Sequence, residues 1–77
     1  MKSFIDFIEI HDTGKQTKSF YIQNKANFAI LGYIIFFPQW RKFVFRPNNE
    51  ESVIFDPSCL REIISFCEEQ TAQWRAG

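Results

Sequence analysis

The sequence predicts an α+β fold, in which an antiparallel four- to five-stranded meander is followed by one C-terminal helix packed on one sheet face. Two observations predict it. Short apolar stretches separated by polar turn segments extend over about residues 3–55, and one apolar stripe with helical spacing follows over about residues 57–74. Because 77 residues are enough for only one domain, we expect residues 1–77 to fold as a single unit.

Strands are expected where β-branched and aromatic residues lie between turn signals. The first stretch mixes two apolar alternations, which predicts a bulge near Phe7–Ile8. The most apolar stretch, residues 28–37, has no alternation and ends before Pro38, which predicts a central strand covered on both faces. The expected strands cover residues 3–11, 19–23, 28–37, 42–46 and 53–55.

The C-terminal helix has the clearest local signals. Asp56 can accept hydrogen bonds from the free N–H groups of a first helical turn, and Pro57 follows where a missing N–H costs nothing. The apolar stripe that we expect to face the sheet consists of Leu60, Ile63, Ile64, Cys67, Thr71 and Trp74. The expected core consists of Phe20, Ile22, Ile34 or Ile35, Phe43, Phe45, Phe55, Leu60, Ile63, Ile64 and Cys67.

The composition excludes several classes of protein. The chain is 45% hydrophobic and 23% charged, which argues against disorder. No apolar run approaches the ~20 residues needed to cross a bilayer, and the N-terminus has no signal-peptide pattern. We therefore expect a small protein that acts in the cytoplasm of a host cell and does not contact membrane.

The chain has more aromatic side chains than one small core can bury. It contains ten Phe residues, and one helix covers only one face of a sheet. The other face of residues 28–37 then needs a homodimer, another partner or strong sheet curvature to cover it. A homodimer is our first expectation.

The net charge is zero, but the charges are unevenly distributed. Residues 1–49 carry seven basic and three acidic side chains, whereas residues 50–77 carry two basic and six acidic ones. A basic sheet and an acidic helix would attract each other. The same separation of charge can also orient a charged partner.

Residues suited to catalysis are sparse, and we expect a protein that is not an enzyme and uses no cofactor or metal. The single histidine, His11, lies beside Asp12 without further members of a catalytic or metal-binding set. Cys59 and Cys67 would lie about 12 Å apart along a helix, too far for a disulfide. They are expected to be buried free thiols.

A basic and aromatic segment is the best candidate for a binding site. Its residues surround the expected turn after the central strand, and they are Tyr33, Trp40, Arg41, Lys42 and Arg46. Trp, Tyr and Arg are enriched at the centres of protein interfaces. Aromatic rings with nearby cations also bind single-stranded nucleic acid. A third possibility is structural, with Trp40 capping the sheet edge and the cations solvated.

A resemblance to a group of known proteins lies in two segments, residues 38–47 (PQWRKFVFRP) and residues 53–63 (VIFDPSCLREI). They look like small uncharacterised proteins of phages and mobile elements, in which a Trp-Arg-aromatic strand ending in Phe-x-Pro precedes a Phe-Asp…Cys-Leu…Ile helix start. The resemblance covers residues 31–67 and implies a phage-derived protein that binds and inhibits a host defence or a host enzyme. In architecture, the expected fold is also similar to the single-stranded-DNA-binding transcription cofactor family.

Overall fold

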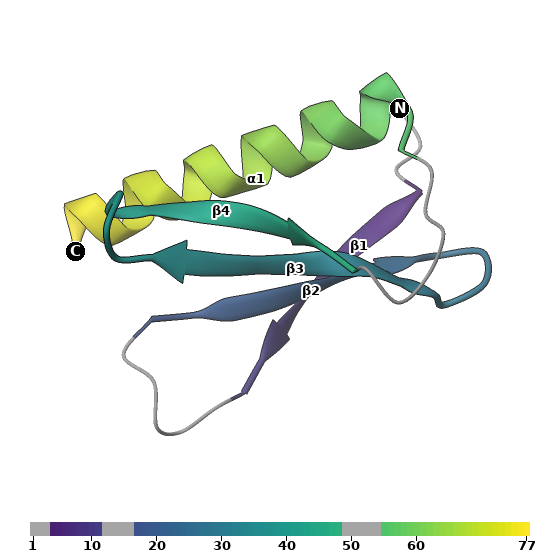
Figure 1. Ribbon diagram of the computed structural model, residues 1–77, viewed down its shortest axis with the longest axis horizontal. Coiled ribbons are helices and arrows are strands. Elements are labelled where there is room, and N and C mark those ends of the chain that lie inside the picture. Colours follow the sequence, from purple (N-terminus) through teal and green to yellow (C-terminus); the bar gives the residue numbers. More distant parts are fainter. Residues whose placement is uncertain (1–3, 12–16, 49–54) are drawn as a thin grey trace.

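The computed structural model describes residues 4–11, 17–48 and 55–77, and it contains one open antiparallel sheet with one helix packed on it (Figure 1). The strands follow the chain in the order β1-β2-β3-β4. The elements are β1 (Ile5–Ile10), β2 (Ser19–Asn24), β3 (Ile30–Phe37), β4 (Lys42–Pro47) and α1 (Pro57–Ala76). The predicted α+β fold is therefore confirmed. Of the expected strand at residues 53–55, Phe55 is described and lies outside any strand, and the other two residues lie outside the described part.

The predicted bulge near Phe7–Ile8 is wrong. Strands β1 and β2 pair without interruption from Ile5 opposite Asn24 to Ile10 opposite Ser19. The ring of Phe7 stacks on Phe66 of α1, with 4.0 Å between the ring centroids. The next side chain along the strand, that of Ile8, points to the opposite face. Apolar residues occupy both sets of alternate positions in β1 because both faces of the sheet carry apolar groups. The pattern therefore does not require the extra residue of a bulge.

An irregularity lies instead between β2 and β3. Ile22 pairs with Gly32 whereas Gln23 pairs with Ile30, so Leu31 is the extra residue on β3. Leu31 is buried and belongs to the same core cluster as Ile22. The bulge thus lets Leu31 join the core, although strict alternation along β3 from Gly32 would place its side chain on the opposite face.

The core lies between the sheet and α1. Its buried members are Ile5, Phe20, Ile22, Leu31, Ile34, Phe43 and Ile63, and the partly buried residues packed against them are Phe7, Phe36, Phe45, Phe55, Cys59, Phe66 and Cys67. The prediction was wrong for Leu60 and Ile64, which are 41% and 56% exposed. The helix is rotated so that Phe66, its largest apolar side chain besides Trp74, packs against the sheet in their place.

The beginning of α1 follows the capping pattern expected from the sequence. The Asp56 carboxylate accepts hydrogen bonds from the Cys59 backbone N–H at 2.8 Å and from the Ser58 hydroxyl at 2.9 Å. These two donors hold the pKa of Asp56 below its usual value, the backbone N–H contributing most. Pro57 follows in the first turn. Together they fix where the helix starts, and hence the register in which its apolar stripe meets the sheet.

Candidate binding surface on the open sheet face

The sheet has an outer face, the one opposite α1. In Figure 1 the single helix of the described chain lies along the other side of the sheet, next to β4. Alternation and strand register assign the outer face to the side chains of Asp6, Ile8, Ile10, Ser19, Tyr21, Gln23, Ile30, Tyr33, Ile35, Phe37, Lys42, Val44 and Arg46. This is the uncovered face that the apolar central strand predicts.

The middle of the outer face is apolar. Across the four strands, Ile8 pairs with Tyr21, Tyr21 with Tyr33, and Tyr33 with Arg46. In the next row, Ile35 pairs with Val44. We refer to Ile8, Tyr21, Tyr33, Ile35 and Val44 as the apolar centre. These side chains are only half-buried, because they shield one another while no described element lies on them.

One end of the outer face carries an exposed tryptophan. The Trp40 ring meets Phe37 nearly edge-on, with 4.7 Å between the centroids, and Trp40 is 63% exposed. Phe37 in turn pairs with Lys42 across the β3–β4 hairpin. Arg41, in the turn between them, has a φ of 54°. We call Phe37, Trp40, Arg41 and Lys42 the Trp40 corner.

The five residues singled out from the sequence thus divide into two groups. Trp40, Arg41 and Lys42 lie at the hairpin turn, whereas Tyr33 and Arg46 pair with each other farther along the strands. Sequence reasoning missed Phe37, which supports the Trp40 ring, and the partners of Tyr33 on β1 and β2. Tyr33 and Phe37 are four residues apart in one expected strand, so strand geometry alone could have placed them on one face, but the pairing with β1 and β2 required the register.

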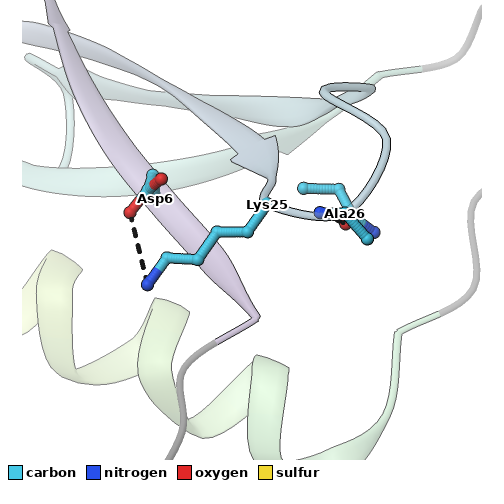
Figure 2. Close-up of polar contacts among 4 residues, drawn as sticks. Asp6, Lys25 and Ala26 are labelled. Carbon is cyan, nitrogen blue, oxygen red and sulfur yellow. Dashed lines mark hydrogen bonds and ion pairs between the residues drawn. The ribbon is translucent and has the colours of Figure 1, made fainter.

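Charged groups lie at the borders of this face. On the β1 side, the Lys25 ammonium lies 3.6 Å from the Asp6 carboxylate, and Figure 2 shows the lysine side chain extending from the hairpin turn to β1. Both side chains are about half exposed, so this pair contributes less than about 1 kcal/mol. On the β4 side, no ion pair joins Arg41, Lys42 or Arg46 to another described residue. This border is therefore cationic.

The described residues that could carry out chemistry do not converge on one site. His11 is exposed at the end of β1, and Asp12 lies outside the described residues. Cys59 and Cys67 are free and half-buried. Burial raises the pKa of the Cys67 thiol to about 11, and burial together with Asp56 raises that of Cys59, so both thiols are protonated at neutral pH. Within residues 4–11, 17–48 and 55–77, no group of three or more His, Cys, Asp or Glu is placed to hold a metal ion.

Comparison with known proteins gives one weak similarity. The chain is 27% identical over 66 residues to an uncharacterised 9.3 kDa protein of Acholeplasma phage L2, and the alignment covers 86% of this chain and 82% of that protein. It therefore extends beyond residues 31–67 and agrees with the resemblance to a small phage-type protein. No protein-family model and no solved structure matches the chain.

One further finding concerns membranes. Among the described residues, α1 is the single helix, and it is not apolar enough to span a bilayer.

Proposed function

We propose that this chain is a non-enzymatic protein-interaction module that binds its partner through the Trp40 corner. The observation that carries the proposal is Trp40 itself, 63% exposed and supported by Phe37, beside Arg41 and Lys42, which form no ion pair with another described residue. A contiguous exposed apolar patch bordered by charged groups is typical of a protein-interaction site, and Phe37 and Trp40 form such a patch beside Arg41 and Lys42. Trp and Arg are also the residue types whose loss costs most at protein interfaces.

The rest of the outer face favours a protein over a nucleic acid. Ile8, Ile35 and Val44 are aliphatic, so they offer no ring on which a base can stack. The net charge of zero also provides little general attraction for phosphates. Single-stranded nucleic acid remains the second candidate, because the aromatic rings and the cations of β4 share one face.

The similarity to a phage protein supports a phage origin for the chain, and so suggests where this interaction takes place. We propose that the chain is phage-derived and acts in the cytoplasm of a bacterial host. Its partner would then be a host defence protein or a host enzyme that it inhibits. A chain of 77 residues with an exposed aromatic corner suits inhibition by covering a surface.

The test is capture of a partner with matched variants. The tagged chain and its Trp40→Ala variant are compared on the same bacterial lysate, with Ile64→Ala as control because Ile64 is also a large exposed apolar residue but lies on α1. We expect one protein to bind the wild type and Ile64→Ala, and to bind Trp40→Ala at least about tenfold more weakly. Unchanged melting temperatures would show that the fold is intact. Equal capture by the wild type and both variants would contradict the proposal.

A fluorescent oligothymidine separates the second candidate from the first. Binding that weakens steeply with salt and is lost in Trp40→Ala would favour nucleic acid. No binding at low salt would exclude that role for the face.

A further inference from the structure

We propose that the apolar centre of the outer face is a homodimer interface, in which a second copy packs sheet against sheet and the two helices lie on the outside. This inference goes beyond the proposed function, because it concerns Ile8, Tyr21, Tyr33, Ile35 and Val44 rather than the Trp40 corner. The two regions share the outer face but can be altered separately.

The solvent-exposed area of the chain is large enough to include an interface with a second copy. A folded monomer of 9.2 kDa is expected to expose about 4,900 Å², whereas this chain exposes 5925 Å². The excess of about 1,000 Å² is close to the ~800 Å² that each partner buries in a stable protein interface. A small ligand would leave most of such an excess uncovered.

The chemistry of the apolar centre suits a second sheet. Its five side chains carry no formal charge, and the only polar groups among them are the two tyrosine hydroxyls. Tyrosine can bury its ring while its hydroxyl finds a partner at the interface. Sheets pack with their strands within about 30° of each other and interdigitate their apolar side chains. The centre can therefore be buried without the cost of removing a charge from water.

The charged borders favour a two-fold arrangement. With the symmetry axis parallel to the strands, β1 of one copy lies across β4 of the other. Lys42 and Arg46 on the β4 border of one copy then face the β1 border of the other, where Asp6 is already paired with Lys25, so the cations of the two β4 borders stay apart. The same operation places the two Trp40 corners at one end of the dimer. A closed pair of this kind leaves neither outer sheet face free for a third copy.

Mass in solution tests the proposal directly. The wild type is expected to have a mass of about 18 kDa, twice 9.2 kDa, in sedimentation equilibrium. Ile35→Glu should raise the dimer dissociation constant at least about a hundredfold, because two uncompensated carboxylates would be buried near the axis. Ile64→Glu, on the exposed side of α1, is the control that should stay dimeric. A monomeric wild type from micromolar to millimolar concentration, or a dimer that survives Ile35→Glu unchanged, would overturn the proposal.

If Ile35→Glu fails to fold, a second measurement tests the dimer interface in the wild-type chain. In a mixture of isotope-labelled and unlabelled wild-type chains, isotope-filtered spectra should show intermolecular contacts from the ring of Tyr33 to the methyl groups of Ile8 or Ile35. Intermolecular contacts confined to α1 would place the interface elsewhere and overturn the proposal.

The two proposals fail separately. Trp40→Ala should lose the captured partner and keep the dimer mass. Loss of the dimer in Trp40→Ala, with the fold intact, would show that the Trp40 corner belongs to the interface between copies.

Discussion

At the scale of single residues, Gly32 is required by close approach rather than by backbone conformation. A Cβ at this position would lie 2.6 Å from the Arg46 carbonyl oxygen and 2.6 Å from Cε1 of Phe45. The Phe45 ring cannot simply move away, because it packs edge-on against Phe55, with 5.5 Å between the centroids. Gly32 therefore provides the space in which β3 and β4 pair and Phe45 joins the core.

We expect Gly32→Ala to lower the free energy of unfolding by about 1–2 kcal/mol. Overpacking costs about 1–3 kcal/mol, which exceeds the ~0.5–1 kcal/mol gained when glycine is removed from a strand. Urea unfolding measures the difference. Gly77→Ala is the matched control, because the atom nearest its new methyl group would be 3.5 Å away, an ordinary contact. If the two variants are equally stable, Phe45 has room that the structure does not show.

At the scale of elements, the orientation of α1 depends on aromatic contacts. Phe66 stacks on Phe7 and meets Phe20 edge-on, with 4.9 Å between the centroids in the second pair. Ile63, one turn earlier, is 3% exposed. Near the end of the helix, Trp74 packs on Phe36 at 4.6 Å between centroids. This stripe fixes the helix rotation and leaves Ile64 in solvent.

Two adjacent isoleucines test that rotation. Ile63→Ala should cost about 2–5 kcal/mol of stability, because it leaves a cavity under the helix. Ile64→Ala should cost less than about 1 kcal/mol, since its side chain is already 56% exposed. Denaturant titration of both variants gives the comparison. Equal losses would mean that α1 meets the sheet through a different stripe.

The contrast between Ile63 and Ile64 shows what the sequence could specify. The order of four strands and one helix, and the cap at Asp56, depend on local signals that the chain carries. The rotation of α1 does not depend on local signals, because several faces of the helix carry apolar residues. Only contact with the rings of Phe7 and Phe20 determines that Phe66 faces the sheet. Likewise, chemistry alone indicated Trp40 and its cations as a candidate site, whereas the strand register was needed to place Ile8 and Tyr21 in one row with Tyr33.

At the scale of the whole molecule, one side chain joins the two layers by hydrogen bonds. The Phe43 backbone N–H, on the edge strand β4, donates to the Thr71 hydroxyl of α1 at 2.9 Å. That hydroxyl donates in turn to the Cys67 carbonyl at 2.8 Å. An edge strand otherwise presents its donors to solvent or to another chain. The helix therefore both covers the core and satisfies a donor at the edge of the sheet.

Hydrogen exchange on Thr71→Val should separate this local link from global stability. The variant keeps the shape of the side chain but removes the acceptor of the Phe43 N–H. A buried donor without a partner costs about 1–3 kcal/mol, so the Phe43 amide should exchange roughly 5- to 150-fold faster. The amides of Ile22 and Ile34, whose side chains are fully buried, should exchange only through global unfolding and report the loss of overall stability. Thr71→Ser keeps the hydroxyl and should leave the Phe43 amide protected. If Phe43 exchanges at the same rate in both variants, the hydroxyl does not hold β4 to the helix, and apolar packing alone joins the layers.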